Sequence, residues 1–388
     1  MTKKQIIFIE SKPTTYTYKV ARTLKLTGKY ETVLVCFSEV DRTFFGKAFD
    51  KFHILEWSHK PTLKNFLDFF RKVFGKRGRA FFNELKKMKP YAFQVTGPDL
   101  FTTMAMFSLK KSPIIYFPYD IWHADKRNFL FTKNPGIKGC FQKFFGRICF
   151  KIADGILHKG EPNELELLDC NLNIPDLSFL PGCLDEWVCQ TKKKKQSKEV
   201  HIGYAGAPWA SEAGATPFSE VIKELIPQKL HFHIFGDFTD KKERKLSFKK
   251  IKDKQYFHIH EKEKPDKLNE RLSQYDYGII PSFFDNSLNP LLIEKGMANR
   301  LFNYIEAGVP IIVNKRCKFM ASIVEDNKIG FSIDYKDLKN LKEIIAKQDY
   351  EKMRQNMKKA QEKFKLSKRI KELEQFYEKV VKENRRET

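Results

Sequence analysis

Short apolar segments rich in β-branched residues alternate with segments of helical periodicity along this 388-residue sequence. Such alternation predicts βα units, in which parallel strands are covered by helices on both faces. The expected strands are Gln5–Glu10, Thr32–Phe37, Ala92–Thr96, Pro113–Phe117, Gly155–His158, Val200–Tyr204, His231–Phe235, Phe257–His260, Tyr277–Ile280, Pro310–Val313 and Gly330–Ile333. The expected helices are Thr14–Leu26, Thr62–Lys89, Leu100–Leu109, Lys138–Ile152, Phe218–Leu225, Pro265–Ser273, Arg300–Ala307, Asp337–Ala346 and Tyr350–Glu383. The fold class is therefore expected to be α/β.

The alternation is interrupted once, by the polar and charged stretch Thr191–Lys198. We therefore expect an N-terminal Rossmann-like domain at residues 1–190, a linker at 191–198, a C-terminal Rossmann-like domain at 199–350 and a terminal helix at 351–388. Two such domains that face each other form a cleft, where α/β proteins bind their ligands. The terminal helix is expected to cross back over the first domain.

The charge of the chain is high and uneven. The formal net charge is +24, and residues 51–151 alone hold 20 Lys or Arg against 6 Asp or Glu. Polyanions such as nucleic acid, anionic lipid headgroups or phosphorylated substrates would be attracted to such a surface, although a general lysine bias is an alternative explanation. Aromatic residues accompany the cations in Phe69–Phe82 and Phe141–Arg147, which favours an anionic membrane surface. Packing of these aromatics against the sheet is the alternative, and nucleic acid is not the expected partner, since no known nucleic-acid module is present.

The cellular setting follows from what the sequence lacks. The seven cysteines are odd in number and include no C-x-x-C pair, which argues against a zinc site and against a disulfide framework and suits a reducing compartment. The start of the sequence has no apolar stretch of signal-peptide length, and no run of about 18 apolar residues occurs. We expect a cytoplasmic protein, with any membrane association peripheral and on the inner face.

One segment, Asn299–Val313, combines a helix, a glycine stop and a buried strand. Gly308 suits the left-handed position after a helix, and Pro310 opens the strand where its missing N–H matters least. Arg300 and Asn303 are three residues apart and therefore share one face of the helix. At the mouth of a parallel sheet, this face would present a cation and a polar group to a ligand.

This segment resembles the nucleotide-binding helix of family 4 and related GT-B glycosyltransferases, and Asn289–Gly296 before it resembles the same family. Arg300 matches the basic position of the family pattern. Asn303 stands where the family has a glutamate that accepts hydrogen bonds from ribose, which implies weaker or altered ribose recognition. The resemblance implies a GT-B fold and binding of a nucleotide-sugar donor.

Further segments resemble the same family in the same order along the chain. They are Ala153–Gly160, Leu180–Asp185, His201–Trp209, Phe235–Asp237 and Tyr275–Ser282. The resemblance places donor binding on Gly206, Ala207, Gly236, Ser282, Arg300, Leu301 and Asn303. The Arg and Lys that many family members carry after the first loop of the second domain are replaced by Ser211, Glu212 and Thr216, so Arg300 is the first candidate for the diphosphate.

The first domain would hold the acceptor. Asp120 and His123 follow an expected strand and could activate or orient an acceptor hydroxyl, although Asp120 could equally cap the next helix. Tyr119 stands where the family often has a histidine. His158 and Lys159 end another strand and are expected to face the cleft.

The sequence thus predicts a glycosyltransferase that moves a sugar from a UDP or GDP donor to a lipid-linked or polysaccharide acceptor, with Asp120, His123 and Arg300 as catalytic residues. Similarity to family 4 implies retention at the anomeric carbon. No Asp-x-Asp motif occurs, and no metal or other cofactor is expected. The alternative is a non-catalytic GT-B-like protein that binds sugar nucleotides or polyanions.

Overall fold

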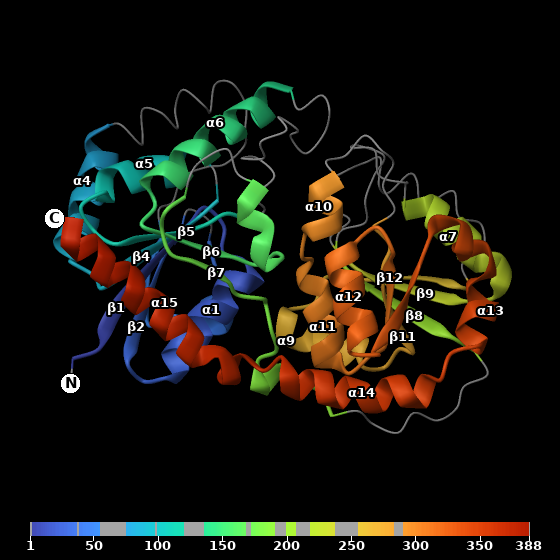
Figure 1. Cartoon of the computed structure of the whole chain (residues 1–388). Helices are drawn as coiled ribbons and strands as arrows, with labels where there is room; N and C mark the ends of the chain where they lie inside the picture. Colours follow the sequence, from blue (N-terminus) through green and yellow to red (C-terminus); the bar gives the residue numbers. More distant parts are fainter. Residues whose placement is uncertain are drawn as a thin grey trace. The chain divides into compact units, whose positions relative to one another are not determined.

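The computed structural model describes residues 2–36, 39–54, 75–97, 99–119, 136–167, 172–190, 199–206, 218–236, 255–282 and 290–387. The chain divides into two compact units (Figure 1). The first unit contains Met1–Leu130, Asn134–Pro181 and Arg369–Thr388, and the second contains Phe131–Lys133 and Gly182–Lys368. The predicted linker, residues 191–198, lies outside the described residues.

The first unit is built on a parallel sheet whose seven described strands have the order β3-β2-β1-β4-β5-β6-β7. The strands are β1 (Lys4–Glu10), β2 (Tyr30–Cys36), β3 (Lys51–Ile54), β4 (Ala92–Thr96), β5 (Ile114–Phe117), β6 (Gly155–His158) and β7 (Asp176–Ser178). The helices are α1 (Thr15–Leu26), α2 (Arg42–Phe45), α4 (Lys76–Lys87), α5 (Leu100–Leu109) and α6 (Gly136–Ile152), with the 3-10 helix η2 (Pro162–Leu167). The expected strands of this unit are confirmed, and β3 and β7 are further strands.

Alternate residues of these strands pack on opposite faces of the first sheet. Ile7, Val33 and Val95 belong to a core cluster that also contains Phe82 of α4 and Phe101 of α5. Phe82 is therefore part of the core, as the packing interpretation of the basic aromatic stretch requires. On the other face, the buried hydroxyl of Tyr377 in the terminal helix donates to Gln94 of β4.

The second unit contains a parallel sheet whose six described strands have the order β10-β9-β8-β11-β12-β13. They are β8 (His201–Ala205), β9 (His231–Phe235), β10 (Phe257–His260), β11 (Tyr277–Ile280), β12 (Ile311–Asn314) and β13 (Gly330–Ile333). The helices are α7 (Phe218–Leu225), α9 (Pro265–Leu272), α10 (Pro290–Lys295), α11 (Asn299–Ala307), α12 (Lys318–Asp326), α13 (Leu341–Ala346) and α14 (Tyr350–Lys363). Three 3-10 helices accompany them: η3 (Asp185–Trp187), η4 (Ile226–Gln228) and η5 (Tyr335–Asn340).

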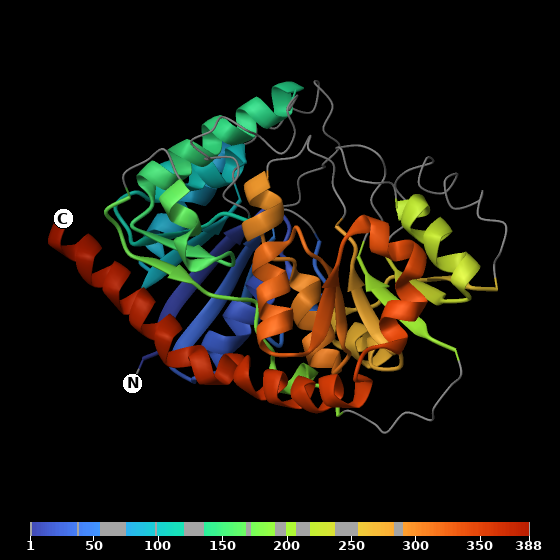
Figure 2. The same ribbon diagram turned by 45° about the vertical axis from the view of Figure 1, so that its right-hand side comes forward.

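Helices cover both faces of the second sheet (Figure 2). Ile202 and Phe232 share a buried cluster with Val221 of α7, which lies on one face. On the opposite face, a Cβ at Gly203 of β8 would lie 3.2 Å from the Leu272 side chain of α9. Both sheets therefore have the helix–sheet–helix layering that the alternating sequence predicts.

Aspartates that directly precede a strand tie it to the strand beside it. Asp154 Oδ2 accepts a hydrogen bond from the N–H of Ile114 at 2.8 Å, so the start of β6 is joined to the start of β5. Asp276 Oδ2 accepts from the N–H of His201 at 2.7 Å and joins β11 to β8 in the same way. Asp154 and Asp276 belong to the family-like segments Ala153–Gly160 and Tyr275–Ser282. These hydrogen bonds give a structural reason for an aspartate at each position.

The predicted single helix Tyr350–Glu383 is two helices, α14 and α15 (Leu366–Glu387). Between them, Lys365 forms a parallel bridge with Cys183, since Cys183 N–H donates to Phe364 O and Leu366 N–H donates to Cys183 O, both at 2.9 Å. Helix α15 spans the division between the units, because its residues from Arg369 onward belong to the first unit. Backbone hydrogen bonds to Cys183 therefore take the place of helical hydrogen bonds at this point.

No helix in the described part of the chain is both long enough and apolar enough to cross a lipid bilayer.

Candidate functional site

The carboxyl ends of the second sheet's strands hold three of the predicted donor residues. Gly206 follows β8, Gly236 follows β9 and Ser282 comes shortly after β11. Gly206 has φ +131°, a conformation that side chains rarely adopt, and its N–H donates to Phe235 O at 2.9 Å. The Ser282 carbonyl accepts from Asn314 Nδ2 at 2.5 Å. These strand ends form one edge, as parallel strands require.

Arg300, the second residue of α11, reaches this edge. Its Cζ lies 4.6 Å from the centre of the Tyr204 ring, and a Cβ placed on Gly206 would lie only 3.2 Å from its Nη2. The Nη1 atom is buried and makes no hydrogen bond to any described residue. A buried guanidinium nitrogen without a hydrogen-bond partner is costly, so this position favours an anion.

Tyr304 fixes α11 on the same edge. Its hydroxyl donates to Ile279 O at 2.9 Å and accepts from the Ala205 N–H at 3.2 Å. A Cβ at Gly278 would come within 2.4 Å of the Tyr304 ring, so only glycine leaves room for it. The orientation of Arg300 is therefore set by a helix that is bonded to the ends of β8 and β11.

The other two predicted residues of α11 differ in role. Leu301 is fully buried in the core and serves to hold the helix. Asn303 is 8% exposed, and its side chain forms no hydrogen bond within the described residues. The N-cap residue, Ala298, supplies no side-chain cap, so the first N–H groups of α11 lack that partner.

Glu306, at the far end of α11, is a structural residue that the sequence reasoning missed. The side chain is fully buried; Oε1 accepts from Leu184 N–H and Oε2 from Asn269 Nδ2, both at 2.9 Å. A carboxylate beside a helical glycine stop gives no local signal of this role, because both partners are distant in sequence. Glu306 therefore fixes α11 to α9 and to the segment before η3.

In the first unit, Tyr119 lies after the carboxyl end of β5 and donates a hydrogen bond to Glu10, the last residue of β1. Burial raises the pKa of Glu10 to about 7. Nearby, the Ser11 hydroxyl donates to Asp99, which caps α5. Burial raises the pKa of Asp99 as well. Sequence reasoning missed this pair of carboxyls, because neither has a motif around it.

His158 and Lys159 end β6. His158 is 1% exposed, with Nδ1 3.6 Å from Glu164 Oε2 and Nε2 4.0 Å from Asp176 Oδ2. Lys159 is half-buried beside it. The predicted residues Asp120 and His123, like Ala207 of the second unit, lie outside the described residues.

Comparison with known proteins connects this geometry to a class. Residues 213–374 match the family model described as the C-terminal domain of glucosyltransferase 3-like proteins. The pneumococcal O-GlcNAc transferase GtfA, solved with UDP and GlcNAc, superposes with a TM-score of 0.65 at 10% identity, over 98% of this chain and all of that one. The chain has the GT-B fold of glycosyltransferases.

Two other solved structures share this fold. The S. aureus MnaA–UDP structure has a TM-score of 0.60 at 13% identity and covers 97% of each chain. UGT2 of Phytolacca americana, complexed with UDP-2-fluoro-glucose and pterostilbene, has a TM-score of 0.57 at 12% identity and covers 99% of each chain. A sequence search of curated proteins found no match. The GT-B protein is thus glycosyltransferase-like, and its second half carries the family match.

Proposed function

We propose that this GT-B protein is a glycosyltransferase that moves a sugar from a UDP- or GDP-activated donor to a glycan or lipid-linked acceptor. The observation that carries the proposal is the buried Nη1 of Arg300, which lacks a hydrogen-bond partner among the described residues at the edge where GT-B proteins bind their donors. A diphosphate would supply the missing negative charge.

The chemistry follows from this cation. As the bond between the anomeric carbon and the diphosphate oxygen breaks, negative charge develops on the leaving group, and the acceptor oxygen forms the new bond as it loses its proton. Arg300 and the uncapped N–H groups at the start of α11 would stabilise the departing diphosphate. These groups supply the charge stabilisation that a metal gives in other enzymes, so we propose metal-independent transfer. Retention at the anomeric carbon is proposed from the family 4 resemblance.

UDP is the nucleotide that we favour. The GtfA, MnaA and UGT2 structures all contain UDP or a UDP-sugar. The ribose would lie beside Asn303, whose amide oxygen accepts a hydrogen bond without contributing charge. We therefore expect weaker ribose binding than a glutamate would give at this position.

The acceptor would bind to the first unit. Asp120 and His123 are proposed to act on the acceptor hydroxyl, and the location of Tyr119, directly before Asp120, at the carboxyl edge of the first sheet supports this. The basic charge of residues 51–151 suits an anionic membrane or a lipid-linked acceptor. Two exposed phenylalanines, Phe107 on α5 and Phe144 on α6, support peripheral contact with a membrane.

Replacement of Arg300 by Ala tests the proposal. We expect UDP affinity, measured by calorimetry, to fall at least tenfold, because one charge-assisted contact to phosphate is worth about 1.5–3 kcal/mol. Arg300→Lys should recover part of the affinity, since it restores charge without the planar fork. Arg271→Ala, a change to an exposed cation on α9, is the matched control.

Unchanged UDP and GDP binding by Arg300→Ala would contradict the assigned role. Turnover decides between the two candidate functions. Release of UDP from a panel of UDP-sugars, dependent on Arg300, supports the transferase. Binding without any sugar transfer or hydrolysis would instead support the non-catalytic sugar-nucleotide-binding protein.

A further inference from the structure

Five histidines, here called the histidine ladder, lie side by side on one face of the second sheet. His201 is on β8, His231 and His233 are on β9, and His258 and His260 are on the edge strand β10. The two-residue spacing within β9 and β10 puts both histidines of each strand on the same face. Ring centroids are 4.3 Å apart for His233 and His258, and 4.4 Å apart for His201 and His231. This cluster holds more than half of the chain's nine histidines.

Hydrogen bonds between the rings all have the same sense. Nδ1 of His201 faces Nε2 of His233 at 2.9 Å, and Nδ1 of His233 faces Nε2 of His260 at 3.0 Å. Nδ1 of His231 likewise faces Nε2 of His258 at 3.1 Å. One tautomer satisfies all three contacts, with every Nδ1–H donating. That tautomer places the lone pairs of His201 and His231 on Nε2, one of the two ring nitrogens through which a histidine binds a metal.

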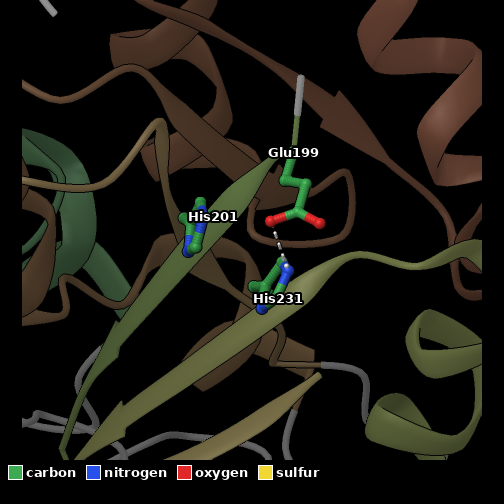
Figure 3. A group of neighbouring side chains, drawn as sticks. All are labelled: Glu199, His201 and His231. Carbon is green, nitrogen blue, oxygen red and sulfur yellow. Dashed lines mark ion pairs between the residues drawn. The ribbon is translucent and has the colours of Figure 1, made fainter. Parts of the chain in front are cut away.

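A carboxylate lies beside the ladder where β8 and β9 begin. Glu199 points its carboxylate toward His231, and His201 lies on the neighbouring strand (Figure 3). Each of the three residues offers a ligand atom, and these atoms lie within 4.8 Å of one another. Nε2 of His231 is buried, forms no hydrogen bond with the described residues, and lies 3.2 Å from Glu199 Oε2. Two ligands of a tetrahedral zinc, each about 2.0–2.1 Å from the ion, are about 3.3 Å apart.

We propose that Glu199, His201 and His231 bind a Zn²⁺ ion, with water as the fourth ligand. Imidazole nitrogens and a carboxylate are a ligand set that zinc prefers over calcium or magnesium. His233 and His258 accept hydrogen bonds from the two ligating rings and hold them in orientation, as outer partners of zinc histidines do.

Binding requires the His201 ring, which is stacked on the His231 ring, to turn and move toward the other two ligands. The His231–Glu199 pair already has the tetrahedral separation, so the wider distance involves His201. The Glu199 side chain is 57% exposed, and its carboxylate can therefore follow the ion without repacking of the core.

This site is separate from the donor edge. His201 and His231 are the first residues of β8 and β9, whereas Gly206 and Gly236 follow the ends of the same strands. A five-residue strand spans roughly 16 Å, so the zinc would not contact the diphosphate. The metal therefore joins the starts of β8 and β9 and takes no part in sugar transfer.

Zinc binding by the full-length protein, stripped with EDTA and free of any histidine tag, tests the site. Calorimetry should give one Zn²⁺ per chain, and the ion should raise the melting temperature. Co²⁺ should give the intense visible absorption of a tetrahedral site. Glu199→Gln and His231→Gln should each weaken zinc binding at least tenfold, in line with the loss of one ligand.

His53→Gln, which replaces an exposed histidine on β3 of the first unit, is the control and should bind zinc like the unaltered protein. The proposal is overturned if the unaltered protein binds no stoichiometric zinc, or if Glu199→Gln leaves the affinity unchanged. Glu199 is exposed, so this variant remains decisive even if His231→Gln does not fold. UDP binding should be the same in all variants, which separates failure of the zinc site from failure of the donor site.

Discussion

At the scale of single residues, the proposed donor edge depends on what is packed around Arg300. The guanidinium lies over the Tyr204 ring and close to Gly206. A side chain at Gly206 would crowd Nη2 and would also have to adopt φ +131°. Glycine is therefore needed here for two reasons, and one of them is the close approach of the cation itself.

The buried carboxyl of Glu10 should make stability depend on pH. Its pKa rises from about 4.5 in the unfolded chain to about 7 in the folded protein. The folded state therefore binds more protons between these values, and the stabilising contribution, complete below pH 4.5, is lost as the pH rises through 7. We expect the stability of the unaltered protein relative to Glu10→Gln to fall by about 3 kcal/mol between pH 4 and pH 8.

Urea unfolding of both proteins across this range measures the effect. Glu378→Gln, an exposed change in the same unit, should follow the unaltered protein at every pH. Parallel curves for Glu10→Gln and the unaltered protein would show that the carboxyl does not titrate in this window.

At the scale of elements, buried polar side chains add hydrogen bonds that hold short strands and helices in place. Most described strands have only four or five residues, which gives few ladder hydrogen bonds. Asp154 and Asp276 each add a bond to the start of the neighbouring strand. Glu306 does the same for α11 through two hydrogen bonds. The orientation of α11 thus depends on buried polar contacts as well as on apolar packing.

Asp154→Ala should destabilise the protein by about 1–3 kcal/mol, because the Ile114 N–H loses its acceptor. Asp154→Asn should cost less, since the amide oxygen can still accept. Chemical unfolding measures both changes. Asp326→Ala, at the exposed end of α12, is the control and should stay within about 0.5 kcal/mol of the unaltered protein. An equal effect of Asp154→Ala and Asp326→Ala would contradict the bonding role.

At the scale of the whole molecule, the charge is concentrated in one quarter of the sequence. Residues 51–151 carry a net +14, and the described part of this range lies in the first unit, which has the proposed acceptor role. The other unit carries the family match and the proposed donor edge. The distribution of charge therefore agrees with the proposal that the first unit binds the acceptor and the second unit binds the donor.

Flotation with lipid vesicles tests the membrane proposal. We expect the protein to float with anionic vesicles at low salt, to bind neutral vesicles much less, and to be released as ionic strength rises. Phe144→Ser should weaken flotation, while Ile259→Ser, an exposed apolar residue of the second unit, should not. Equal binding to neutral and anionic vesicles would contradict an electrostatic contact. An oligonucleotide shift at the same salt, without flotation, would favour nucleic acid instead.

The sequence by itself determined the α/β class, most of the strands and helix α11. These features depend on hydrophobic periodicity and on local stops such as Gly308 and Pro310, which act within a few residues. Gly308 does adopt the left-handed conformation, with φ +73°. The resemblance of Arg300 and its neighbours to GT-B proteins was readable for the same reason, because the pattern is continuous in the chain.

Only the tertiary structure decided which side chains meet. His231 and His258 are 27 residues apart, and Tyr119 and Glu10 are 109 apart, so no local pattern connects them. Parallel pairing of strands brings each pair together, and burial then raises the pKa of Glu10. The break between α14 and α15 arises in the same way, since Lys365 pairs with Cys183. Helix propensity depends on neighbouring residues in the sequence, so it cannot predict a break caused by a residue so distant in the chain.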